Sequence, residues 1–177
     1  MGNTQTAEQI HKSPSVPTGP VKAVLVDGDL LKGDRQEWLE EHIAKWQGAG
    51  LEVQVLERPV KNARELFEKA GLGDAYPHLP ERLSAGKTVL HITSRASSFV
   101  DTFEPPHGVV CHRFNKAVLA TGCPFDCEYC YLQLTYRINP YLRIYANLDR
   151  AIAELKRLDT KTEKPLKIGR ASCRERV

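Results

Sequence analysis

The chain has 177 residues, with 25 lysines and arginines against 22 aspartates and glutamates and a formal net charge of +3. Its hydrophobic content of 41% and charged content of 27% are ordinary for a soluble globular protein with one or two domains. No apolar run is long enough to cross a bilayer, and the first residues lack a basic and then apolar leader. We therefore expect a cytoplasmic protein with no membrane partner. The small charge excess is no evidence for nucleic-acid binding.

The amino-terminal half predicts a small α/β unit. Residues 1–19 are polar and contain too little apolar surface to offset the entropy of ordering, so we expect disorder there. Over residues 20–95, strand-like and helix-like patterns then alternate, which indicates a parallel sheet with covering helices. The predicted strands are residues 21–26, 51–56 and 87–93, and the predicted helices surround Trp38–Trp46 and Ala63–Ala70.

Two polar residues of this unit could suggest chemistry. Asp27 follows the first predicted strand in the sequence Asp27-Gly28-Asp29, and His91 stands inside the third. A lone Asp-Gly-Asp is more typical of a turn than of a catalytic site. A histidine inside an apolar strand is more often packed than a ligand. We therefore interpret both residues as structural.

The second half predicts the opening of another α/β layer. Residues 96–116 are rich in turn-forming residues and are interpreted as a connector. Residues 117–167 begin with a strand that leads directly into Thr121-Gly122-Cys123, at the end of a strand where ligand sites of α/β folds collect. Residues 141–146 predict a further extended segment, and Asn147 is a good N-cap for the helix that follows.

Three cysteines, Cys123, Cys127 and Cys130, have the spacing C-x3-C-x2-C. Three thiolates this close can hold three corners of a cubic iron–sulfur cluster and leave one iron without a protein ligand. An open coordination position on a metal is where chemistry takes place. A noncatalytic zinc module is the alternative, with Cys111 or His112 as the fourth ligand. Zinc modules usually pair their ligands as two short C-x2-C knuckles, which this segment does not.

With the aromatic Tyr129 before the third cysteine, this motif resembles the signature of the radical S-adenosylmethionine (SAM) enzymes. The resemblance implies a [4Fe-4S] cluster whose open iron chelates SAM, and Tyr129 beside the adenine of SAM. It also implies cleavage of SAM to a 5′-deoxyadenosyl radical by an electron from a donor such as flavodoxin or ferredoxin. The fold it implies is an α/β unit followed by the first elements of a partial (β/α) barrel.

A longer stretch resembles the spore photoproduct lyase family of radical SAM proteins. The cysteines are followed at once by Tyr131-Leu132, and then by Pro140-Tyr141-Leu142-Arg143-Ile144-Tyr145-Ala146-Asn147. This resemblance implies repair of a methylene-bridged thymine dimer in DNA, with Tyr131 relaying a hydrogen atom or simply packing over the cluster. A radical SAM enzyme acting on RNA or a small molecule remains an alternative, because the residues that choose the substrate are expected further along the family's fold.

The last ten residues, 168–177, match the conceptual translation of a common sequencing adapter. We therefore expect a non-native tail that packs against nothing, and a natural protein that continues differently after Lys167. The chain would then be an amino-terminal fragment, itself inactive. Cys173 lies near the distance at which the family's hydrogen-donating cysteine follows the triad, and we interpret this as coincidence.

Overall fold

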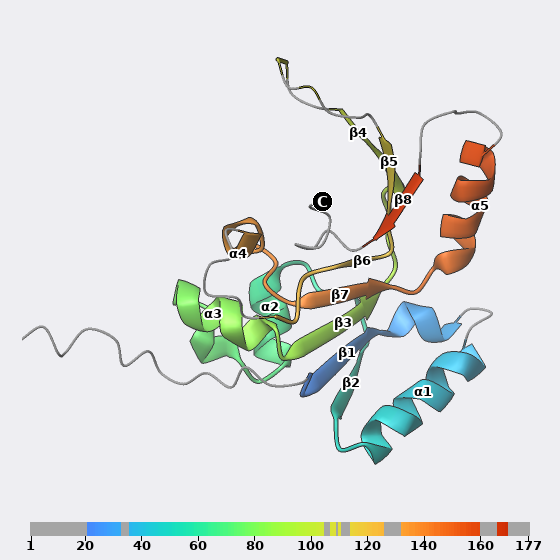
Figure 1. Ribbon diagram of the computed structural model, residues 1–177. Coiled ribbons are helices and arrows are strands. Elements are labelled where there is room, and N and C mark those ends of the chain that lie inside the picture. The colour runs from blue at the N-terminus through green and yellow to red at the C-terminus, as the bar shows by residue number, and fades with distance from the viewer. Residues whose placement is uncertain are drawn as a thin grey trace, which may run out of the picture.

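The computed structural model describes residues 21–32, 36–104, 107–108, 110, 114–125, 132–159 and 166–169. The expectations for residues 1–19 and 170–177 lie outside these ranges. Within them, the chain forms one five-stranded and one three-stranded sheet with helices, so the predicted α/β class is confirmed (Figure 1). Among the described residues, no helix is both long and apolar enough to cross a membrane.

The larger sheet has the strand order β2-β1-β3-β7-β6. Its first four strands are parallel, and β6 pairs antiparallel with β7. The three strands predicted in the first half are all present, each within a few residues of its expected bounds. The strands are β1 (Ala23–Asp27), β2 (Glu52–Leu56), β3 (Val89–Thr93), β6 (Ala120–Thr121) and β7 (Leu142–Tyr145).

Helices cover both faces of this sheet (Figure 1). Alternate strand residues point to opposite faces. Val24 and Val26 therefore pack with α1, whereas Leu25 packs with α2 and α3. The helices are α1 (Gln36–Gly48), α2 (Ala63–Lys69) and α3 (Leu79–Gly86), and the short 3-10 helices are η2 (Gly28–Lys32) and η3 (Gly73–Ala75).

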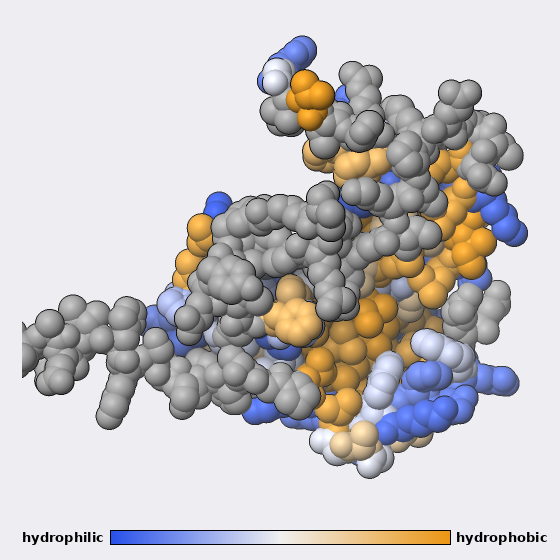
Figure 2. Space-filling view, in the orientation of Figure 1, coloured by the Kyte–Doolittle hydropathy of each residue, from blue (hydrophilic) through white to orange (hydrophobic). Residues whose placement is uncertain are grey.

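The smaller sheet has the order β4-β5-β8. Strand β5 pairs antiparallel with β4 and parallel with β8. Its strands are β4 (Val100–Phe103), β5 (Phe114–Val118) and β8 (Leu166–Gly169), and the helices near it in sequence are α4 (Leu132–Thr135) and α5 (Leu148–Asp159). In Figure 2, apolar side chains are visible at the surface between α1 and α5.

Three expectations need correction. The segment 96–116 is not only a connector, because it contains β4 and the start of β5. The expectation that residues 168–177 pack against nothing is wrong for Ile168 and Gly169, which pair with Ala117 and Val118 through backbone hydrogen bonds. Asn147 precedes α5, but the contacts of its side chain are with the peptide groups of Arg95.

The larger sheet also crosses the expected boundary between residues 20–95 and 117–167. Strand β7 adds to β3 in parallel register, with Leu90 opposite Leu142 and Thr93 opposite Tyr145. Strand β6 then adds to β7. The two parts of the chain therefore share one sheet, and the cysteine segment starts directly from its edge strand.

Candidate functional site: the cysteine loop and an adjoining polar pocket

The first cysteine follows the edge strand β6 after a single glycine. Gly122 has a φ of +90°, a left-handed conformation that favours glycine. A Cβ atom at Gly122 would lie 2.6 Å from the carbonyl oxygen of Tyr141. The backbone after β6 and the backbone before β7 are therefore too close together for any residue but glycine at position 122. The turn therefore fixes where the cysteine loop leaves the sheet.

Cys123 is half-buried and is a free thiol. A thiol at a loop start, without a disulfide and partly open to solvent, fits the soft ligand that an iron–sulfur cluster needs. The other predicted site residues, Cys127, Tyr129, Cys130 and Tyr131, lie outside the described residues, as do Cys111 and His112 of the zinc alternative. The structure thus places one of the three predicted ligands.

A second group of polar residues lies on the larger sheet and was not predicted as a site. Asp27 ends β1 and is buried. Its carboxylate accepts hydrogen bonds from Nε2 of His91 at 2.9 Å and from Oγ1 of Thr93 at 2.5 Å. Burial raises the pKa of Asp27, but these two hydrogen bonds, with the charges of His91 and Arg143, outweigh burial and leave the pKa below its ordinary value.

The interpretation of Asp27 as a turn residue is therefore wrong, whereas the packed state predicted for His91 is confirmed. Asp27 is the last residue of the strand, and the two β3 side chains satisfy its carboxylate inside the fold. One signal could have indicated this. In the predicted strand, His91 and Thr93 interrupt an apolar run at a spacing of two, and so share one face at the strand end where Asp27 also lies.

Strand β7 extends the polar group toward the cysteine loop. Arg143 donates a hydrogen bond to the hydroxyl of Tyr141. Burial raises the pKa of Tyr145, but hydrogen bonds with Arg143 and Thr121 and the nearby charges of Arg143 and Arg95 leave it below its ordinary value. Thr121 directly precedes Gly122 and the first cysteine. A continuous polar network thus links β7 with the strand that leads into the cysteine loop.

These side chains line a pocket of about 390 Å³. Its walls come from the ends of β1, β3 and β7, from the segments 59–62 and 94–97, and from Asn139. Three basic side chains, those of Lys61, Arg95 and Arg143, line it together with the one carboxylate of Asp27.

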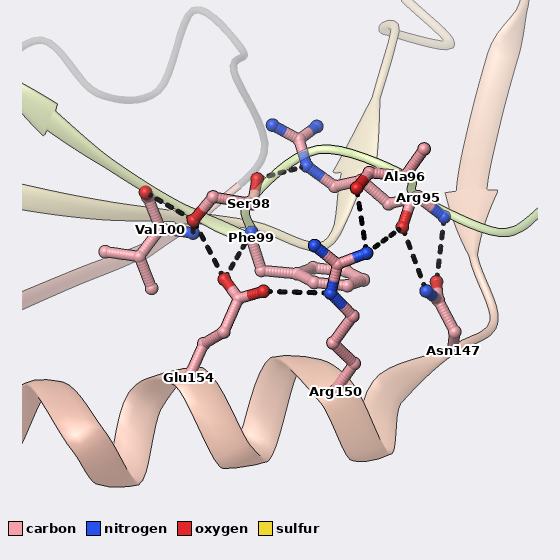
Figure 3. A network of polar contacts seen from close by, with 8 residues as sticks. All are labelled: Arg95, Ala96, Ser98, Phe99, Val100, Asn147, Arg150 and Glu154. Carbon is pink, nitrogen blue, oxygen red and sulfur yellow. Dashed lines mark hydrogen bonds and ion pairs between the residues drawn. The ribbon is translucent and has the colours of Figure 1, made fainter.

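A polar network fixes the segment 94–97 of this wall (Figure 3). The Asn147 side chain pairs with both peptide groups of Arg95, accepting at 2.8 Å and donating at 3.0 Å. Arg150 donates to the carbonyl oxygens of Arg95 and Ala96 at 3.1 and 2.8 Å. Glu154 in turn holds Arg150. Helix α5 therefore holds the backbone that carries the Arg95 side chain into the pocket wall.

Comparison with known proteins gives consistent results. The family model for spore photoproduct lyase matches residues 85–175. The spore photoproduct lyase of Geobacillus sp. (strain Y412MC61) is 56% identical over 36 residues, which cover 20% of this chain and 11% of that protein.

Solved structures show the same fold. A spore photoproduct lyase mutant with bound dinucleoside spore photoproduct has a TM-score of 0.59 and 23% identity, with 85% of this chain and 40% of that chain covered. A mutant with bound AdoMet and dinucleoside spore photoproduct has a TM-score of 0.54 and 23% identity, with 84% and 39% covered. This chain thus spans about two fifths of the solved chains. Because the family model covers half of it, the chain belongs to the spore photoproduct lyase family.

Proposed function

We propose that the protein to which this chain belongs is a radical SAM lyase that repairs a thymine dimer lesion in DNA. The observation that carries the proposal is the C-x3-C-x2-C motif inside the family-matched residues, with its first thiol free at the end of an edge strand. The bound dinucleoside spore photoproduct and AdoMet of the solved relatives support the lesion and SAM as ligands.

Three thiolates of this chain, from Cys123, Cys127 and Cys130, would hold a [4Fe-4S] cluster. When bound and reduced by a donor such as flavodoxin or ferredoxin, the cluster supplies the electron that cleaves SAM. The turn at Gly122 would position the first thiolate, because its backbone packs against that of Tyr141. Tyr129 would contact the adenine of SAM. Tyr131 would offer a phenol that can pass a hydrogen atom, as a phenyl ring cannot.

The lesion would have to leave the base stack to reach such a site. Extrusion costs a few kcal/mol, and less for a damaged base than for an intact one. Residues that select the lesion are proposed to belong to the part of the protein not represented in this chain, which spans about two fifths of its solved relatives. The proposed setting is the reducing cytoplasm, where unpaired cysteines persist.

Anaerobic reconstitution with iron and sulfide tests the cluster. The chain should gain broad visible absorption and about four irons. Replacing Cys123, Cys127 or Cys130 with alanine should each abolish both signals, and Cys111→Ala is the matched control that should leave them intact. Stoichiometric zinc without a cluster, or loss of the cluster in Cys111→Ala, would refute the three-thiolate assignment.

The whole protein tests the reaction. After reduction with dithionite it should convert SAM to 5′-deoxyadenosine and methionine, and should return the spore lesion in DNA to two thymines. Tyr131→Phe should lower lesion turnover more than it lowers iron content. Cleavage of SAM without repair of the lesion would keep the radical SAM assignment and point to RNA or a small molecule as substrate.

A further inference from the structure

The pocket described above lies where the topology of the larger sheet changes direction. From β1 the chain moves to β2 on one side, and then returns to place β3 on the other side of β1. In open parallel sheets, ligands bind outside the carboxyl ends of the strands at such a switch point. Asp27 and Thr93 stand at these two strand ends. The strands that line the pocket are β1, β3 and β7, whereas Cys123 follows β6.

The pocket wall is polar where the same sheet face is otherwise apolar. Leu25 and Val89 lie on that face in the core, one strand period before Asp27 and His91. Burying polar groups costs free energy unless hydrogen bonds satisfy them. In the described part of the chain, Nδ1 of His91 and Nε of Arg143 are buried without a hydrogen-bond partner. Apolar side chains would fill these positions without leaving buried polar atoms unpaired, so the packing of the sheet does not explain why His91 and Arg143 stand here.

The charges favour an anion. Each carboxylate oxygen of Asp27 accepts a hydrogen bond inside the fold, from His91 or from Thr93, and Asp27 is the one carboxylate among the residues that line the pocket. Arg143 and Arg95 are fixed by their neighbours. The first donates to Tyr141, and the second lies over the Tyr145 ring with its guanidinium carbon 5.1 Å from the centroid. Arg95 also donates to the carbonyl oxygen of Ser98 at 2.6 Å and pairs with the half-exposed carboxylate of Asp101 at 3.5 Å. Lys61 lies exposed at the rim. Arginine forks held in this way match the geometry of phosphate oxygens.

We propose that this pocket binds the phosphate group of a nucleotide, with Arg143, Arg95 and Lys61 as its cationic contacts. Its volume of about 390 Å³ falls in the range of small-molecule sites. The phosphate comes either from a free mononucleotide or from the backbone of a DNA strand.

Calorimetric titration of the 177-residue chain tests the pocket before any iron is added, so the result is independent of the cluster. The probes are inorganic phosphate, thymidine monophosphate and a short oligothymidylate. The monophosphate should bind with a Kd below about 1 mM, and inorganic phosphate should compete with it. Tighter binding of the oligonucleotide than of the monophosphate identifies DNA as the source, and the reverse order identifies a free nucleotide.

Three variants place the binding in the pocket. Arg143→Gln should weaken binding about tenfold or more, because it removes a charged hydrogen-bond donor. Lys61→Gln, at an exposed position that does not threaten the fold, should weaken it about threefold. Arg64→Gln is the matched control, since Arg64 is exposed, pairs with Glu68 and does not line the pocket. Absence of binding by all three probes, or equal loss in Arg64→Gln and Arg143→Gln, overturns the proposal.

Discussion

The cysteine loop and the polar pocket are built in opposite ways. The three cysteines lie within eight consecutive residues, so their chemistry is written in one short segment. The pocket instead joins Asp27, His91 and Arg143, which are separated by more than fifty residues at each step. A motif of the first kind shows in the sequence before any fold is known. A site of the second kind exists only because parallel strands bring their ends to one edge of a sheet.

The two regions also depend differently on the fold. The cysteine loop depends on the backbone position of the turn at Gly122, and the pocket depends on contacts between polar side chains of different strands. Strand β7 serves both, because it pairs with β6 before the loop and carries Arg143 and Tyr145 into the pocket. Mutations on either side of β7 can therefore separate the two requirements.

The largest effect on stability is expected at Gly122, where the cysteine loop begins. Gly122→Ala should lower the free energy of unfolding by about 3 kcal/mol, because it combines a left-handed backbone with a Cβ atom against the Tyr141 carbonyl. Urea unfolding measures this loss. Iron uptake should fall as well, since the first thiolate would move.

Gly50→Ala is the matched control for that variant. Gly50 has a similar φ of +81°, but a Cβ atom there would meet nothing within 4 Å. Only the backbone cost of about 1 kcal/mol should remain, with iron uptake unchanged. Equal losses in the two variants would show that the close approach to Tyr141 has no energetic consequence.

An intermediate effect is expected inside the pocket. Asp27→Asn should destabilise the chain by about 2 kcal/mol, because the negative charge and one of the two acceptor oxygens that His91 and Thr93 contact are lost. Asp29→Asn, at an exposed position beside Lys32, should change stability by less than about 0.5 kcal/mol. Chemical unfolding of both variants at neutral pH makes the comparison.

The same pair gives a pH dependence. The pKa of Asp27 is lowered in the fold, so its contribution is fully present above the unfolded-state value of 3.8 and is lost as the pH falls through the lower folded value. The stability difference between the original chain and Asp27→Asn should therefore be constant near neutrality and shrink in acid below about pH 4. A difference that grows as the pH falls would contradict the lowered pKa.

Particular residues show how far the sequence could predict this structure. The three strands and the helices α1 and α2 of the first half followed from hydrophobic periodicity, because their apolar residues face a core on each side of the sheet. Helix α3 was not predicted. Strand β4 was missed, since its residues are mostly exposed and, among the described strands, pair with β5 alone. The addition of β7 to β3 could not be predicted either, because pairing between distant segments leaves no local pattern. Asp27 was misinterpreted for the same reason, as its partners are 64 and 66 residues away.

The smallest effect is expected in the network that holds the pocket wall from outside (Figure 3). Glu154 accepts hydrogen bonds from the Ser98 hydroxyl at 2.8 Å and the Phe99 amide at 2.6 Å, and its other oxygen pairs with Arg150. Burial raises the pKa of Glu154, but these donors and the charge of Arg150 leave it below its ordinary value. Glu154→Gln retains one acceptor oxygen, so it can keep either the loop contacts or the Arg150 contact. We expect a loss of about 1 kcal/mol and faster hydrogen exchange at the Phe99 amide.

The control variant is Glu68→Gln, which breaks an exposed pair of the same spacing with Arg64 and should cost less than about 0.5 kcal/mol. If the Phe99 amide exchanges at the same rate in both variants, the Glu154 carboxylate does not order residues 98–99, and among the described residues only Asn147 and Arg150 link this side of the molecule to the pocket wall.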